Sequence, residues 1–389
     1  MHYIKLLRPP VIEKVRSEPI LKIVLAITTD LGDAYLSPRD PIDLVVVGAY
    51  TVQKDGREQL VPVNLTQRSA PKWRSGMRVL KIDVPLPAHP ITTVQVRPLN
   101  RQLTAMGTTD IWPPTGQGLI MTAFSDIGQK DPVCFRSLRL PTPDNQTIQV
   151  EEDMGDSIAR HIWDSGIATA SLIADMFMVN NSSNSNGNNN VNNGVAMPSF
   201  RSLLQRRRQA DSPLKILEIG CGIGTLGIAM ARILASCSPP SPKVLMTDLP
   251  EAEERARANI ARQASAPGDV SSILDFESLD WEDGKLGVFG EKVQAEAWDL
   301  VIVSDCTYNT DTLLPLVQTL SAVRQLSAEK NDGGGPKVFL ATKSRHSSER
   351  EFFDLMEGEG WAIEEESVIP LPHIDGEAKP IEVYLFDKK

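Results

Sequence analysis

The sequence predicts two domains, a β-rich domain followed by an α/β domain that is built on a mostly parallel sheet. The chain has 389 residues, which is more than one average domain contains. Short apolar or alternating runs separated by proline fill residues 1–150, whereas strand-like and helix-like patterns alternate from residue 151 onward. We therefore expect a β-rich accessory domain over residues 1–150 and an α/β domain over residues 151–389.

The strands of the first domain are predicted from apolar runs and from alternation. In residues 79–84, apolar residues at 80, 82 and 84 alternate with charged residues at 81 and 83, which is the period of a half-buried strand. We expect strands at residues 20–29, 44–50, 79–84, 92–96 and 118–124. Helical spacing is rare in this half, so a β-rich fold follows.

The period becomes helical after Gly155, where apolar residues recur at positions 158, 162, 168, 172 and 176. An asparagine-rich run follows at residues 180–194. Its composition offers no apolar surface to bury, and it predicts a disordered surface loop.

Strands and helices then alternate to the end of the chain. We expect strands at residues 214–219, 243–248, 273–280, 299–304, 337–342, 363–369 and 381–386, and helices at 226–234, 250–263, 311–327 and 347–357. Such alternation predicts a parallel sheet with helices on both faces. No helix separates the last two strands, so we expect an antiparallel hairpin at one edge.

Composition excludes several classes of protein. The formal net charge of -10 argues against a protein that mainly holds nucleic acid, and it suits a basic protein partner. The cysteines lack the spacing of a disulfide framework or a metal site, so we expect no bound metal. No apolar run approaches the roughly 20 residues that cross a bilayer, and the N-terminus lacks a signal-peptide core. We therefore expect a cytoplasmic protein that binds neither membrane nor nucleic acid.

The most informative segment is the glycine-rich run between the strand at 214–219 and the following helix. Glu218 is followed by Gly220, Gly222 and Gly224. Glycines let the backbone turn tightly and approach a ligand, and the helix N-terminus directs free N–H groups at the same place. The pattern predicts a cofactor-binding loop.

Two cofactors compete for this loop. Positions 222, 224 and 227 spell the dinucleotide fingerprint, and Asp248 stands at the distance that this fingerprint requires. However, the glycine run already begins at Gly220, and Glu218 would repel a pyrophosphate. S-adenosylmethionine carries an ammonium and a sulfonium, which an acidic strand end can serve. We therefore favour S-adenosylmethionine, with a dinucleotide or a loop without ligand as alternatives.

Acidic residues follow the next two strands. Asp248 ends the second strand, where a carboxylate can accept both ribose hydroxyls, although it could instead cap the helix that follows. Asp280 and Trp281 close the third strand, where a carboxylate and an indole suit the amine and the face of adenine. The alternative for this pair is a plain turn with a buried tryptophan.

A motif after the fourth strand gives a family resemblance. The strand ends in Ser304-Asp305-Cys306-Thr307-Tyr308, Ile162-Trp163-Asp164-Ser165-Gly166 lies upstream, and Thr342-Lys343-Ser344-Arg345 lies downstream. Over about residues 151–389 the sequence resembles methyltransferase family 16. Members of this family are seven-strand protein-lysine methyltransferases, and their targets include chaperones and translation elongation factors. The β-rich extension looks most like the fungal members that act on elongation factors.

The resemblance implies a class I methyltransferase, with a Rossmann-like seven-strand sheet, an antiparallel end and S-adenosylmethionine as cofactor. It implies that Trp163 covers the methionyl end of the cofactor and that Ser304 belongs to the cofactor site. For Trp163 the alternative is a core residue. Arg345 and Glu349 are expected to form a structural pair. The asparagine-rich insertion departs from the family pattern without touching a site residue.

Asp305 and Tyr308 are the candidate catalytic residues. Amide-methylating relatives carry Asn-Pro-Pro-Tyr at this place, and a carboxylate suits an acceptor that arrives as a cation. Tyr308 would wall the lysine channel and hold the amine, and most of the acceleration would come from positioning in a dry site. The alternative is a helix cap and a core aromatic.

These patterns predict a monomeric S-adenosylmethionine-dependent protein-lysine methyltransferase whose partner is an elongation factor or chaperone, with the first domain used in substrate recognition. Two alternatives remain open. A small-molecule N-methyltransferase of the nicotinamide type would need extra helices that close the pocket, and the sequence shows none. A non-catalytic S-adenosylmethionine-binding interaction protein is the other alternative, and intact Glu218, Asp248 and Asp305 argue against such a decayed site.

Overall fold

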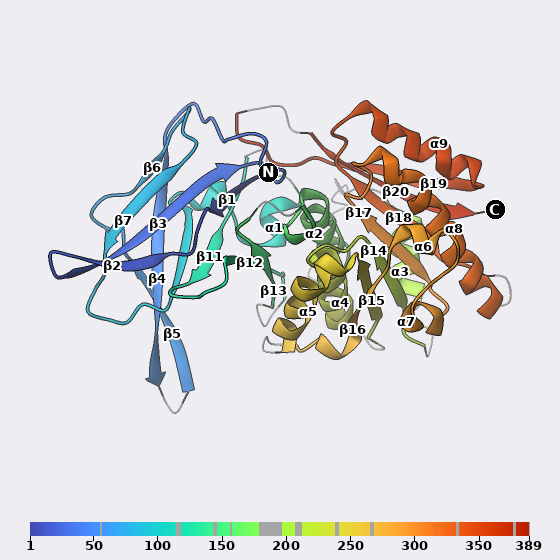
Figure 1. Cartoon of the computed structure of the whole chain (residues 1–389), viewed down its shortest axis with the longest axis horizontal. Helices are drawn as coiled ribbons and strands as arrows, with labels where there is room; N and C mark the ends of the chain where they lie inside the picture. Colours follow the sequence, from blue (N-terminus) through green and yellow to red (C-terminus); the bar gives the residue numbers. More distant parts are fainter. Residues whose placement is uncertain are drawn as a thin grey trace, which may run out of the picture. The chain divides into compact units, whose positions relative to one another are not determined.

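The computed structural model divides into two compact units (Figure 1). It describes residues 1–54, 57–113, 118–142, 146–155, 158–178, 197–206, 212–237, 241–264, 268–331, 334–375 and 379–388. The first unit comprises Met1–Leu138, Gln149–His161 and Pro372–Ala378, and the second comprises Arg139–Ile148, Ile162–Leu371 and Lys379–Lys389. The predicted asparagine-rich loop at residues 180–194 lies outside the described residues.

The first unit contains two sheets. The six-stranded sheet has the order β2-β3-β1-β10-β9, with β7 paired to β3, and the seven-stranded sheet has the order β13-β12-β11-β8-β4-β5, with β6 paired to β4. Its strands are β1 (His2–Leu6), β2 (Val11–Val15), β3 (Glu18–Thr28), β4 (Ile42–Lys54), β5 (Arg57–Asn64), β6 (Lys72–Trp73), β7 (Leu80–Pro85), β8 (Thr93–Pro98), β9 (Thr104–Ala105), β10 (Ile120–Met121), β11 (Ala123–Asp126), β12 (Val133–Arg139) and β13 (Thr147–Asp153). One short helix, α1 (Thr108–Ile111), stands beside them.

Alternation places the core of the first unit. In β7, Ile82 and Val84 are buried while Lys81 and Asp83 are exposed, as their spacing predicts. Apolar residues from strands of both sheets, such as Ile23 of β3 and Val96 of β8, form one buried cluster. The two sheets therefore share a core.

The second unit contains one sheet with the order β16-β15-β14-β17-β18-β20-β19. Its strands are β14 (Lys215–Ile219), β15 (Lys243–Asp248), β16 (Leu274–Ser278), β17 (Leu300–Ser304), β18 (Lys337–Thr342), β19 (Trp361–Ile369) and β20 (Ile381–Lys388). β14–β18 run parallel, and β20 is antiparallel to both of its neighbours. The predicted seven-strand sheet with an antiparallel end is confirmed.

Helices cover both faces of this sheet (Figure 1). They are α2 (Asp164–Met178), α3 (Pro198–Arg206), α4 (Thr225–Cys237), α5 (Pro250–Ala264), α6 (Trp281–Gly284), α7 (Glu291–Ala295), α8 (Leu313–Lys330) and α9 (Glu351–Gly358). On one face Leu340 of β18 packs in a buried cluster with Leu316 of α8 and Phe352 of α9. On the other face Phe339 stacks on Phe200 of α3 with ring centroids 4.3 Å apart. Burial on both faces explains why the central strands are continuous apolar runs.

Parallel strands bring their carboxyl ends to one edge of the sheet. β14, β15, β16 and β17 end at residues 219, 248, 278 and 304, and residues predicted to bind the cofactor or the acceptor lie at or just beyond each of these ends. This edge is where ligands bind in open α/β sheets.

Candidate functional site

The glycine loop between β14 and α4 has a backbone that only glycine adopts readily. Gly220, Gly222 and Gly224 have φ values of +70°, +53° and +81°. A Cβ at Gly220 would lie 2.3 Å from the Cys306 sulfur, and a Cβ at Gly224 would lie 2.7 Å from the Met246 sulfur. The loop therefore needs glycine for its conformation and for its close packing on neighbouring strands.

Glu218 lies beneath this loop. Its side chain is buried, and its Oε2 accepts a hydrogen bond of 3.0 Å from the Gly227 amide in the first turn of α4. Burial, opposed by the Gly227 hydrogen bond and reinforced by the charge of Asp248, raises the pKa of Glu218 to about 8. The carboxyl group therefore holds a proton near neutral pH and fixes the start of α4 under the glycine loop.

Asp248 joins the glycine loop to the end of β15. Its Oδ2 accepts from the Gly222 amide and its Oδ1 from the Leu249 amide, each at 2.7 Å. Burial raises the pKa of Asp248, and these two hydrogen bonds lower it. The carboxylate thus stands beside the predicted cofactor loop, as a ribose ligand would.

Asp280 and Trp281 occupy the turn after β16. Asp280 is exposed and caps α6, because its Oδ1 accepts from the Glu282 amide at 2.9 Å. The turn predicted as an alternative is therefore present. Trp281 is partly buried, and its ring lies 3.3 Å from the position of a Cβ on Gly220. The indole borders the glycine loop, and the adenine role of this pair stays a prediction.

Asp305 connects the loop after β17 to α2 and to the loop after β18. Its Oδ2 accepts from the Ser165 amide at 3.1 Å, and its Oδ1 accepts from the Lys343 amide at 3.1 Å and from Arg345 Nη1 at 3.2 Å. Asp305 has a φ of +53° and is buried. The carboxylate therefore caps a helix, as the alternative prediction had it. The capped helix is α2, whose Ser165 lies 140 residues upstream, and not the helix that follows Asp305.

Ser304 and Trp163 also face the first turn of α2. Ser304 ends β17, and its hydroxyl lies 3.9 Å from the position of a Cβ on Gly166. Trp163 directly precedes α2, is partly buried, and carries the Arg345 guanidinium over its ring at 5.2 Å. The structure thus brings both predicted cofactor residues to the segment that begins α2.

Sequence reasoning missed the roles of Lys343 and Arg345. Lys343 Nζ pairs with the buried Asp164 carboxylate at 2.6 Å. The sequence predicted that Arg345 pairs with Glu349. For the side chain this prediction is wrong, because the Arg345 guanidinium donates to Asp305 instead. The Glu349 carboxylate accepts from the Arg345 backbone amide at 3.1 Å. The available signal was two cations directly after β18, at the edge where the other site residues lie.

Tyr308 is on the surface, so the alternative of a core aromatic is wrong. Tyr308 is 53% exposed and lies four residues after the end of β17. Partial burial raises the pKa of the Tyr308 hydroxyl, and Cys306, Asp248 and Glu251 raise it further. The hydroxyl therefore stands within electrostatic reach of carboxylates from the end of β15 and the start of α5.

The comparisons with known proteins identify the family. The lysine methyltransferase family matches residues 142–359, which is more than half of the chain. This chain belongs to the lysine methyltransferase family. A UPF0665 family protein from Schizosaccharomyces pombe is 23% identical over 390 residues, covering 100% of this chain and 99% of the relative.

Solved structures of methyltransferases also align with this family member. An S-adenosylmethionine-dependent methyltransferase from Methanosarcina mazei is 15% identical over 50% of this chain and 98% of its own, with a TM-score of 0.33. The glycopeptide N-methyltransferase MtfA complexed with sinefungin is 12% identical over 51% of this chain and 90% of its own, with a TM-score of 0.31.

The enzyme is a methyltransferase, and its cofactor is S-adenosylmethionine. The residues present fit this cofactor, because the glycine loop has a left-handed backbone at Gly220, Gly222 and Gly224 and carboxyl groups border it at Glu218 and Asp248. Within the described residues, no group of three or more histidine, cysteine or acidic residues could hold a metal ion. None of the described helices is long and apolar enough to cross a membrane.

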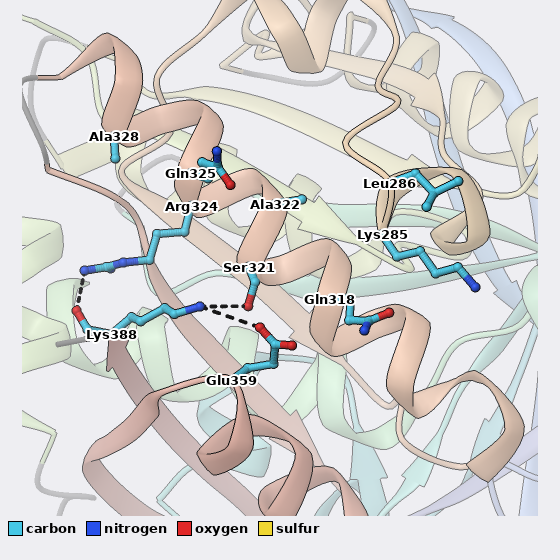
Figure 2. Close-up of a pocket in the computed structure, with 10 residues that line it drawn as sticks. All are labelled: Lys285, Leu286, Gln318, Ser321, Ala322, Arg324, Gln325, Ala328, Glu359 and Lys388. Carbon is cyan, nitrogen blue, oxygen red and sulfur yellow. Dashed lines mark hydrogen bonds and ion pairs between the residues drawn. The ribbon is translucent and has the colours of Figure 1, made fainter.

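A hollow of about 700 Å³ lies elsewhere, over the outer face of α8 (Figure 2). Its charged residues already have partners. Lys388 Nζ contacts Ser321 Oγ at 3.1 Å and Glu359 at 3.8 Å, and Arg324 pairs with Asp387 at 3.0 Å. None of its lining residues belongs to the glycine loop or to the loops after β15 and β17, so we place the active site at the sheet edge and not here.

Proposed function

We propose that this methyltransferase modifies lysine side chains of a protein, with a translation elongation factor or a chaperone as the target class. The observation that carries the proposal is Tyr308. It is an exposed tyrosine on the loop after β17, and carboxylates of Asp248 and Glu251 act on its hydroxyl. A cationic acceptor is favoured at such a place, because nearby negative charge attracts an ammonium group.

The residues support a simple division of work. S-adenosylmethionine, when bound, supplies the methyl group as an electrophile. The acceptor lysine arrives as an ammonium, is attracted by the carboxylates and loses a proton to water before its nitrogen attacks. The Tyr308 hydroxyl can accept a hydrogen bond from the amine and direct its lone pair. Most of the rate would come from this positioning, because methyl transfer from a sulfonium needs little acid or base catalysis.

Asp305 is the second residue that we propose for the acceptor side. The Asp305 carboxylate accepts hydrogen bonds from the Ser165 and Lys343 amides and from Arg345. These bonds fix the direction of the carboxylate. Its role would be both to hold the loop and to present negative charge to the acceptor.

The target class rests on the family resemblance, and the first unit is the proposed substrate-recognition part. A small-molecule N-methyltransferase is disfavoured because the added mass forms a separate β-rich unit with its own core.

The test is to incubate the full chain with radiolabelled S-adenosylmethionine and a cell lysate. The incubation is then repeated with purified elongation factors and chaperones in place of the lysate. We expect a discrete labelled protein band, with methylated lysine in the labelled peptide by mass spectrometry. Tyr308→Phe should label the same band more slowly. Label found only in the small-molecule fraction, or no label at all, would overturn the proposal.

A further inference from the structure

Three consecutive residues at the start of α2 are each held by a different partner from the sheet edge. The Trp163 ring lies under the Arg345 guanidinium at 5.2 Å. The Asp164 carboxylate pairs with Lys343 Nζ at 2.6 Å, and the Ser165 amide donates to Asp305 at 3.1 Å. The partners come from the loops after β17 and β18, so two loops of the site hold one segment.

These links are sheltered from water. The Asp164 side chain is fully buried and the Lys343 side chain is 11% exposed, while the side chains of Arg345 and Asp305 are 18% and 3% exposed. Electrostatic contacts at such positions are screened far less than those at a surface. The three links therefore constrain the segment more than exposed ion pairs would.

Arg345 connects two of the three links. Its Nη1 donates to Asp305 Oδ1 at 3.2 Å and to the Lys343 carbonyl at 3.1 Å, while its guanidinium plane covers Trp163. Trp163 and Ser165 are the sequence neighbours of Asp164. The contacts of Trp163 with Arg345, of Arg345 with Asp305 and of Asp305 with Ser165 therefore form a closed ring with the backbone of residues 163–165. A planar guanidinium can bond a carboxylate through its edge while its flat face covers an indole, whereas a lysine ammonium is a compact point charge without such a face.

We propose that Arg345 is a positioning residue that holds Trp163 in its cofactor-binding orientation. This rests on the cofactor role of Trp163, and it is independent of whether the acceptor is lysine. Arg345 need not touch the cofactor. It acts through the indole and through Asp305.

The test measures the Kd of S-adenosylhomocysteine by calorimetry on the full chain. We expect Arg345→Ala to raise the Kd at least about tenfold, and Arg345→Lys to give an intermediate value because it keeps the charge beside Asp305 and loses the cover on the ring. In a Trp163→Leu background, the same Arg345→Ala change should raise the Kd much less. Such non-additivity identifies residues that act through each other.

Arg324→Ala is the matched control, because Arg324 covers the Trp361 ring at 5.4 Å on another part of the same unit. It should lower the melting temperature while leaving the Kd unchanged. An unchanged Kd in Arg345→Ala, an equal rise in Arg324→Ala, or additive effects of Arg345→Ala and Trp163→Leu would overturn the inference. Failure of the lysine proposal would leave these Kd values as they are, since no acceptor is present in the titration.

Discussion

Asp305 combines backbone strain with a dense set of hydrogen bonds. A non-glycine residue with a φ of +53° is uncommon and persists only where its surroundings enforce it. Here the donors are the Ser165 and Lys343 amides and the Arg345 guanidinium. Strain of this kind concentrates at functional sites, and in this case it turns a carboxylate away from the end of β17 toward the start of α2.

We expect Asp305→Ala to lower methyl transfer by about 100-fold or more, the scale of losing a positioned polar group in an active site. Because the carboxylate also holds Ser165, cofactor binding should weaken as well. Single-turnover methylation measured together with cofactor titration checks both effects. Asp311→Ala, which changes an exposed acid six residues on, is the control. Recovery of the wild-type rate at saturating cofactor would contradict an acceptor role.

Glu218 gives a prediction on pH. Its pKa in the folded protein is about 8, against an ordinary value of 4.5, because it is buried. Between these values the folded protein holds a proton that the unfolded chain has lost. The contribution of this group to stability is therefore complete below pH 4.5 and is lost as the pH rises through about 8.

Glu218→Gln stays neutral at every pH and can still accept from Gly227. We expect this variant to gain stability relative to the wild type as the pH rises from about 4.5 to about 8, following the loss in the wild type, with no further gain above that. Melting temperatures across this range measure the effect. Glu357→Gln, at an exposed position of α9, should show a constant difference. A constant difference for Glu218→Gln too would contradict the assignment.

At the scale of elements, glycine can be required for two reasons, a left-handed backbone conformation and a lack of space for a side chain. Gly220 and Gly287 have similar φ values of +70° and +73°. A Cβ on Gly220 would lie 2.3 Å from the Cys306 sulfur, whereas nothing lies within 4 Å of a Cβ on Gly287. Backbone strain is therefore common to both positions, and steric overlap belongs to Gly220 alone.

We expect Gly287→Ala to cost about 1 kcal/mol, the scale of a left-handed conformation for a residue with a Cβ. Gly220→Ala should cost clearly more and should also abolish measurable cofactor binding, because the loop must move to relieve the overlap. Denaturant unfolding and calorimetry with S-adenosylhomocysteine measure the two effects. Similar stability of the two variants, with cofactor binding retained in both, would show that the loop accommodates the side chain freely.

The sequence predicted the elements whose pattern is local. The strand expected at residues 337–342 is β18 itself, and the helix expected at 250–263 is α5 within one residue. β12 and β13 were missed, because their inward positions include Arg136 and Glu152. These two charges are buried against each other, with Arg136 Nε donating to Glu152 at 2.7 Å. A charge at an inward position breaks apolar alternation, and only the folded pair explains it.

The candidate site shows the same limit. Glycine positions and strand-end acids could be placed on one edge because parallel strands end together. The contact of Arg345 with Asp305 could not be predicted, since 40 residues separate them and the nearer Glu349 offered an obvious partner. Sequence spacing located the site, and the folded structure was needed to pair the charges within it.

At the scale of the whole molecule, each unit has a core of its own. Trp73, Leu25 and Val46 belong to the buried cluster of the first unit, and Trp298 and Leu340 belong to that of the second. The glycine loop and every predicted site residue lie in the second unit. Ligand binding should therefore stabilise the second unit directly, and core changes in the first unit should act on the first.

We expect scanning calorimetry of the full chain to resolve two transitions, of which S-adenosylhomocysteine raises one. At about 100 times its Kd, the ligand adds roughly 2.7 kcal/mol, which corresponds to a shift of roughly 5–10 °C for a unit of this size.

Trp73→Phe is the complementary change. Trp73 is fully buried and its indole N–H donates to the Leu36 carbonyl at 2.8 Å, so losing this bond should lower the other transition by destabilising the first unit by about 1–3 kcal/mol. The ligand shift should be unaltered in this variant. A single transition moved by both the ligand and Trp73→Phe would show instead that the two units unfold as one.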